Sequence, residues 1–147
     1  MTKWLFNVPT KAYFGEGVIE MLPKCLPARK VLLVVGKSSA KMTGLLDRVL
    51  SLIRGGGGQA VVYEGIKPNP EDWQVEEAAE ILRRDGCGAV IGVGGGSVMD
   101  ASKCIAGLAE SGGKMADYVR RKGKADKHFT SSLPSVLIPT LAGTGSE

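Results

Sequence analysis

A run of glycines between an apolar stretch and a helical pattern is the feature that most constrains this chain. Residues 89–91 are apolar and of strand length, and a turn at residues 92–97 follows at once. Beyond it, apolar residues recur at helical spacing: Val98, Ala101, Ile105 and Leu108. Glycine lets a ligand approach the backbone closely, and the first turn of a helix offers unpaired N–H groups to an anion. The stretch therefore predicts a phosphate site, suited best to the pyrophosphate of a dinucleotide.

Two features of this glycine turn depart from the dinucleotide-binding fingerprint. Its third glycine position holds Ser97, and the turn follows the third strand of the expected repeat rather than the first. A simpler interpretation is a tight strand-to-helix turn in which Ser97 is the N-cap and Asp100 completes a capping box. The two interpretations are compatible, because a capped helix still presents its first amides. We expect both capping and phosphate binding.

The rest of the chain alternates strand and helix patterns. The continuous apolar run at residues 30–35 is typical of a strand covered on both faces. Further strands are expected at residues 59–64, 89–91 and 135–138, a hairpin-like pair at 4–6 and 12–14, helices at 18–26, 44–53, 71–84 and from 98 onward, and a short polar helix or loop at 115–124. This alternation predicts an α/β fold, a Rossmann-like parallel sheet with helices on both faces.

In such sheets, ligands bind beyond the carboxyl ends of the strands. Four loops are expected at that edge, all rich in glycine, hydroxyl or amide groups: residues 36–39, 67–70, 94–97 and 140–146. One shared nucleotide crevice explains the four loops together.

Composition excludes several other classes of protein. The chain has 147 residues, 44% hydrophobic and 23% charged, as expected of one globular domain. Its net charge is +4, and its densest basic stretch, residues 120–124, is short and adjoins acidic residues, so we expect no nucleic-acid partner. No apolar stretch approaches the ~20 residues that a membrane span needs. Three cysteines without metal-ligand spacing favour reduced thiols and a cytoplasmic protein.

Three motifs give the chain a resemblance to a known family over its whole length. They are GGGSxxDxxK at residues 94–103, PNP at residues 68–70 and PTxAGTGSE at residues 139–147. The chain resembles the N-terminal domain of the iron-containing (group III) alcohol dehydrogenases. Glycerol dehydrogenases and dehydroquinate synthases share that fold, but the sequence at residues 143–146 argues against them.

The resemblance implies a nicotinamide dinucleotide bound across the domain. The implied cofactor-binding residues are Gly36, Lys37, Ser38, Ser39, Asn69, Gly94, Gly95, Gly96, Ser97, Asp100, Lys103, Thr140, Leu141, Thr144, Gly145 and Ser146. Residues 95–97 would contact the pyrophosphate, with Asp100 and Lys103 supporting that turn, and Asn69 would lie near the adenosine. The hydroxyls of Thr140, Thr144 and Ser146 would line the pyrophosphate and the nicotinamide ribose. Leu141 stands where many members have Thr, so one hydroxyl contact is lost.

The end of the first long strand bears on the choice of cofactor. Family members restricted to NAD often hold an acidic residue there, and a carboxylate repels a 2′-phosphate at close range. Here the stretch is Gly36-Lys37-Ser38-Ser39, with one cation, two hydroxyls and no carboxylate. We expect the chain to accept NADP and to prefer it over NAD. The alternative is that Lys37 points to solvent and Ser38 caps the next helix.

The family also uses a divalent metal, iron or zinc, held by one Asp and three His of a second, helical domain. This chain has a single histidine, His128, which we expect at the surface, so we assign no catalytic or metal-binding residue. We expect residues 1–147 to be the dinucleotide-binding domain of a longer two-domain enzyme, inactive by itself. That enzyme would interconvert alcohols and aldehydes or ketones, and a homo-oligomer is possible.

Two other functions stay open at this point. One is a polyol dehydrogenase domain of the glycerol type, and the other is a stand-alone nucleotide-binding module without catalysis. A purely structural domain would gain no thermal stability from NADPH.

Overall fold

The computed structural model describes residues 3, 9–37, 39–119 and 127–146. Its strands are β1 (Lys30–Gly36), β2 (Gln59–Ile66), β3 (Ala89–Gly94) and β4 (Ser135–Pro139). Its helices are the 3-10 helix η1 (Val18–Lys24) and α1 (Ser39–Met42), α2 (Leu45–Gly55), α3 (Asp72–Arg84), α4 (Gly96–Ser111) and α5 (Met115–Tyr118). The predicted strands at 30–35, 59–64, 89–91 and 135–138 are confirmed, as are the helices at 44–53, 71–84 and from 98 onward.

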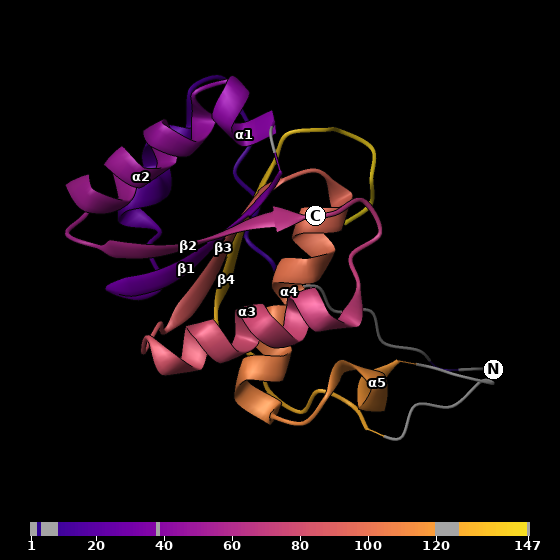
Figure 1. Ribbon diagram of the computed structural model, residues 1–147. Coiled ribbons are helices and arrows are strands. Elements are labelled where there is room, and N and C mark those ends of the chain that lie inside the picture. Colours follow the sequence, from indigo (N-terminus) through magenta and orange to yellow (C-terminus); the bar gives the residue numbers. More distant parts are fainter. Residues whose placement is uncertain (1–2, 4–8, 38, 120–126, 147) are drawn as a thin grey trace.

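The four strands form one parallel sheet in the order β2-β1-β3-β4 (Figure 1). The chain passes from β1 to β2 on one side and then returns to place β3 on the other side of β1. The direction of winding therefore reverses between β1 and β3, which is where open α/β sheets bind their ligands. The register pairs Val35 with Val93 and Gly94 with Pro139, so these strands end at one edge.

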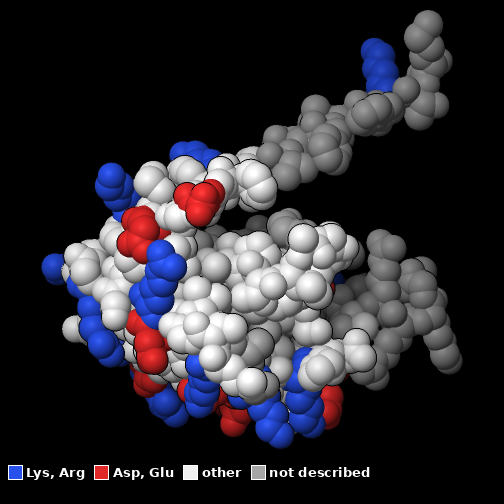
Figure 2. Space-filling model, turned by 90° about the horizontal axis from the view of Figure 1, so that it is seen from above, with Lys and Arg blue, Asp and Glu red and all other residues white. Residues whose placement is uncertain are grey.

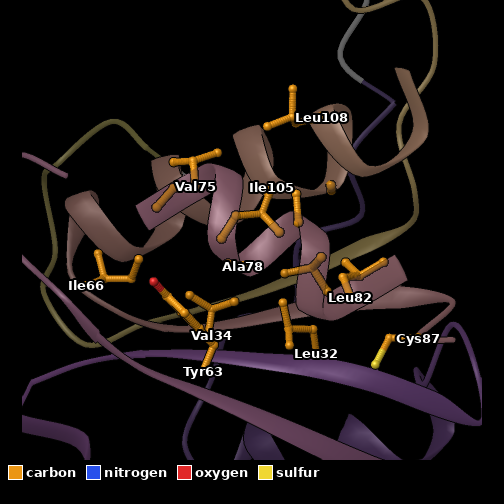
Figure 3. Close-up of a cluster of buried hydrophobic side chains, with 14 of the residues drawn as sticks. Leu32, Val34, Tyr63, Ile66, Val75, Ala78, Leu82, Cys87, Ile105 and Leu108 are labelled. Atoms are coloured by element: carbon orange, nitrogen blue, oxygen red, sulfur yellow. The ribbon is translucent and has the colours of Figure 1, made fainter. Parts of the chain in front are cut away.

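Helices cover both faces of the sheet, as the sequence predicts. On one face η1, α1 and α2 pack over Val31, Leu33 and Val35. On the other face α3 and α4 pack over Leu32 and Val34 (Figure 3). All five of these β1 side chains have no solvent exposure. Because both faces are covered, β1 is apolar without alternation, and each such burial contributes about 1.5–3 kcal/mol.

The prediction that Ser97 caps α4 is wrong. The N-cap is Gly95, which is extended with φ −81° and ψ −173°, and Ser97 lies inside the first turn. Asp100 forms an ion pair with Lys103 instead of closing a capping box. Because α4 already begins at Gly96, Ser97 cannot be its cap, and the Ser97 hydroxyl instead accepts a hydrogen bond from the distant Asn69 backbone N–H.

The N-terminal predictions also need correction. Residues 12–14 form no strand, and Tyr13 and Phe14 are exposed; residues 4–6 lie outside the described part of the chain. The predicted helix at 18–26 is the 3-10 helix η1, which contains Pro23 and ends at Lys24, because proline lacks the N–H that an α-helical hydrogen bond needs. Of residues 115–124, the structure describes those up to 119, which include the short helix α5.

Candidate functional site

The glycine turn joins the buried end of β3 to the first turn of α4. The first helical hydrogen bonds run from the amides of Val98 and Met99 to the Gly95 carbonyl, at 3.0 and 3.1 Å. The amides of Gly96 and Ser97 therefore precede the helical ladder, at the positive end of a 16-residue helix. A side chain built at Gly95 would meet nothing within 4 Å. The turn thus offers amides and open space together, which an anion requires.

The two neighbouring glycines are needed for packing. A Cβ at Gly94 would lie 2.6 Å from Cγ2 of Val98. A Cβ at Gly96 would lie 3.1 Å from Oγ of Ser146 and 3.2 Å from Cβ of Thr144. Gly94 lets the helix pass close to the strand, Gly96 lets segment 140–146 pass close to the helix, and Gly95 alone of the three faces open space.

Segment 140–146 returns from β4 to the start of α4, where the C-terminal end of the chain lies (Figure 1). Its first residue, Thr140, donates its amide to the Gly94 carbonyl at 2.9 Å. Ser146, only 7% exposed, donates its hydroxyl to Oδ2 of Asp100 at 3.0 Å and accepts at its carbonyl from Nζ of Lys103 at 3.1 Å. The segment is therefore fixed at both ends beside the open turn.

The loop after β2 approaches the same turn from the other side. Asn69 has a left-handed backbone (φ 55°), and its N–H lies 3.3 Å from Oγ of Ser97. This loop is held by Gln74 of α3, a buried side chain that donates to the Gly65 carbonyl at 2.9 Å and accepts from the amides of Lys67 and Glu71 at 3.5 Å. Sequence reasoning missed Gln74. The spacing of Glu71 and Gln74, with an acid and an amide three residues apart at a helix start, is the signal that could have found it.

The end of β1 contributes less to this cluster. Gly36 is half-buried at a register shift between β1 and β2, and Lys37 is exposed. Ser38 lies outside the described residues, and Ser39 begins α1. The carboxylate on the neighbouring strand, Glu64, forms an ion pair with Lys41 of α1.

The two charged side chains next to the turn, Asp100 and Lys103, are paired with each other. The ammonium of Lys103, 2.9 Å from Oδ1 of Asp100, holds the pKa of that carboxyl below its ordinary value of 3.8. Partial burial opposes this shift of the Asp100 pKa, and the Ser146 hydroxyl adds to it. The carboxylate is thus ionised at neutral pH but paired with a cation. Seen from above, uncharged side chains fill the middle of the molecule, and charged side chains gather along its left and lower edges (Figure 2).

The structure brings most of the predicted site residues to one edge of the sheet. Residues 94–97 form the turn itself, and Asn69, Asp100, Lys103 and Ser146 are joined to it or to its helix by hydrogen bonds. Gly145 has a positive φ of 70° and is exposed, as is Leu141, 62% of whose surface is accessible. The roles of all these site residues toward a ligand stay predictions.

Two hollows that the described residues form lie away from the glycine turn. Both hollows are shallow, share Gln59 and lie at the opposite edge of the sheet, one beside Arg54 and the other beside Arg29 and Lys30.

Metal ligands do not cluster in the described part of the chain. Among the described residues, no group of three His, Cys, Asp or Glu side chains lies close enough together to hold a metal ion, and His128 is exposed. These residues therefore do not fit the family's metal. Nor does any described helix have the length and apolar character to cross a membrane.

Known proteins match this chain over nearly its whole length. The model of the family described as iron-containing alcohol dehydrogenase matches residues 9–147. Alcohol dehydrogenase 4 of Schizosaccharomyces pombe is 35% identical over 97% of this chain and 33% of its own length. The probable NADH-dependent butanol dehydrogenase 1 of Bacillus subtilis is 37% identical over 100% of this chain and 38% of its own length. The crystal structure of NADH-dependent butanol dehydrogenase A from Thermotoga maritima has a TM-score of 0.87 at 34% identity, covering 97% of this chain and 36% of that one.

The chain belongs to the iron-containing alcohol dehydrogenase family. The resemblance based on the three sequence motifs is confirmed, and so is the Rossmann-like α/β fold. The chain spans about a third of the length of these relatives, between 33% and 38%.

Proposed function

We propose that this chain binds a nicotinamide dinucleotide, with the pyrophosphate against the amides of Gly96 and Ser97. The observation that carries the proposal is the open space at Gly95 beside those amides, next to the β1–β3 switch point of the sheet. Two of the relatives named above are called NADH-dependent, which agrees with it. Asn69 on one side and segment 140–146 on the other would border the ligand.

The activity we propose for the whole protein is the interconversion of alcohols and aldehydes or ketones by hydride transfer. The bound nicotinamide supplies the hydride chemistry. The residues of this chain bind and orient the dinucleotide, and we assign none of them to proton transfer or to the metal. Relatives are named for butanol, methanol and 1,3-propanediol, so we propose alcohols as the substrate class and no single alcohol. A cytoplasmic location and a homo-oligomeric assembly belong to the same proposal.

We further propose that NADP is accepted and preferred over NAD. The support is local: the chain around the end of β1 has Lys37 exposed and no carboxylate among residues 36–39. The carboxylate of Glu64 on the adjacent strand is paired with Lys41, which reduces its repulsion of a 2′-phosphate. Relatives are named NADH-dependent, so a comparison of the two cofactors on this chain decides the preference.

The test is a titration of the chain with NADPH and with NADH, read by cofactor fluorescence, for the unaltered protein and for Gly95→Asp. Aspartate is a favourable N-cap, so this variant should keep its thermal stability or gain some. Its carboxylate would accept hydrogen bonds from the amides that the pyrophosphate needs and would repel the phosphates. We therefore expect dinucleotide binding to weaken by at least about a hundredfold. Gly55→Asp, at an open position at the end of α2, is the matched control and should bind normally. Undiminished binding by a folded Gly95→Asp would contradict the proposal.

A further inference from the structure

Two charged side chains of α4 are directed at one residue far along the chain. Asp100 and Lys103 lie one helical turn apart and pair at 2.9 Å. Asp100 accepts from the Ser146 hydroxyl at 3.0 Å, and Lys103 donates to the Ser146 carbonyl at 3.1 Å. These bonds span 46 and 43 residues of sequence. We call this arrangement of Asp100, Lys103 and Ser146 the Ser146 clamp.

The clamp holds a segment that is otherwise open to solvent. Residues 140–143 and 145 are exposed, whereas Ser146 is buried. Gly143 and Gly145 have φ values of 80° and 70°, which only glycine adopts readily. Because glycine samples many conformations when it is free, ordering the backbone at these two residues costs more conformational entropy than at other residues. At the other end of the segment, the Thr140 amide is fixed to Gly94. The clamp therefore links the distal end of the segment directly to α4.

The position of that end matters to the glycine turn. Ser146 and Thr144 pack where a Cβ of Gly96 would lie, immediately beside the open space at Gly95. If Ser146 were released from Asp100 and Lys103, the segment would no longer form one side of that space. Ordering it again on binding would cost conformational entropy, which lowers affinity.

We propose that Asp100 and Lys103 are positioning residues that set dinucleotide affinity through the Ser146 clamp rather than by contact with the phosphates. The proposal rests on the proposed function, because it assumes that the ligand lies at Gly95. It makes a counterintuitive prediction about charge. A carboxylate close to a pyrophosphate repels it, so removing Asp100 should tighten binding if its charge acts alone. The clamp predicts that the same change weakens binding.

The experiment compares Asp100→Ala, Asp100→Asn, Lys103→Met and the double variant Asp100→Ala/Lys103→Met, titrated with NADPH. We expect Asp100→Ala and Lys103→Met each to raise Kd about five- to tenfold, the scale of one ordinary hydrogen bond, because both side chains are partly exposed. Asp100→Asn keeps an oxygen that accepts from Ser146, so it should lose less affinity than Asp100→Ala. Because both residues act on Ser146, the double variant should be weaker than the worse single variant by no more than about twofold.

Glu20→Gln provides the matched control. Glu20 forms an ion pair with Arg48 on the η1–α2 side of the molecule, with side chains 57% and 54% exposed against 56% and 46% for Asp100 and Lys103. Its loss should leave Kd for NADPH unchanged. If loss of any surface ion pair weakened binding, Kd for NADPH would rise in Glu20→Gln as much as in the clamp variants, and this result would overturn the proposal.

Amide hydrogen exchange of segment 140–146, measured without ligand, tests whether the clamp orders the segment, separately from whether the chain binds a dinucleotide. Faster exchange of this segment in Asp100→Ala and Lys103→Met, together with weaker NADPH binding, supports the clamp as a positioning device. Unchanged or tighter binding by Asp100→Ala, while Gly95→Asp still abolishes binding, overturns it. Absence of binding of both NADPH and NADH by the unaltered chain would instead refute the proposed function on which the clamp's role depends.

Discussion

The Ser102 hydroxyl lies where a side chain at residue 92 would have to be. A Cβ built on Gly92, in the middle of β3, would lie 2.4 Å from Oγ of Ser102 and 3.0 Å from its Cβ. That hydroxyl is fully buried and donates to the Val98 carbonyl at 2.7 Å. The strand and the helix of the glycine turn thus approach each other closely at Gly92 and Ser102, which leaves no room for a side chain at residue 92.

Gly92→Ala should therefore destabilise the fold without touching the proposed ligand site. Overpacking of a well-packed contact costs about 1–3 kcal/mol, and we expect the free energy of unfolding to fall by that amount. Chemical denaturation measures it. Gly55→Ala, at an open helical position, should be neutral or slightly stabilising. Equal effects of the two substitutions would show that the Gly92–Ser102 contact carries no packing constraint.

Gln74→Met should loosen the loop that carries Asn69. Methionine is similar in size to glutamine but forms none of its hydrogen bonds to Gly65, Lys67 and Glu71. Leaving these backbone groups without their partner costs about 1–3 kcal/mol. We expect a loss of stability of that size and weaker NADPH binding, checked by denaturation and by titration. Gln59→Met, at an exposed position, should change neither quantity, and a Gln74→Met protein indistinguishable from the unaltered one would refute this role.

The Asp100 carboxyl should titrate below its ordinary pKa of 3.8, because Lys103 donates a hydrogen bond to its ionised form. A lowered pKa in the folded state means that the ionised carboxylate adds stability above about pH 3.8, and that this contribution is lost as the pH falls through the lowered pKa. Carbon NMR of the Asp100 carboxyl measures the midpoint. Lys103→Met should move the midpoint upward, and an unmoved midpoint would contradict the ion pair.

Lys37→Glu tests the preference for NADP. The substitution replaces a cation by an anion at the end of β1, where the 2′-phosphate is proposed to lie. Each charge near a surface phosphate is worth roughly 1 kcal/mol, so we expect Kd for NADPH to rise by about tenfold or more, and Kd for NADH by less. Lys24→Glu, at the end of η1, controls for net charge. A parallel change in both Kd values would show that Lys37 does not recognise the 2′-phosphate.

The sequence predicted the fold well because its main signals are local. The apolar run of β1 and the glycine turn after β3 are each contained in a few consecutive residues, and strand–helix alternation predicts a parallel sheet. Prediction was weaker at the N-terminus. The aromatic residues Tyr13 and Phe14 suit a strand by propensity, but the structure forms no strand at residues 12–14, and strand propensity depends on such context.

The arrangement within the site depended on contacts that sequence spacing does not contain. The predicted cap at Ser97 failed because α4 begins before that residue, and the freed hydroxyl bonds to Asn69, 28 residues away. The different surroundings of Gly94, Gly95 and Gly96 come from Val98, Thr144 and Ser146, of which two belong to a segment more than 40 residues distant. The motif marks all three glycines alike, and only the structure separates the open one from those packed closely.

The most direct test of the account is a map of where the dinucleotide binds. Amide hydrogen exchange, with and without saturating NADPH, reports protection segment by segment. We predict slower exchange at residues 94–98 and 140–146, and no change at residues 54–60, beside the hollows on the opposite edge of the sheet. Protection at residues 54–60 with none at the glycine turn would contradict the assignment of the site.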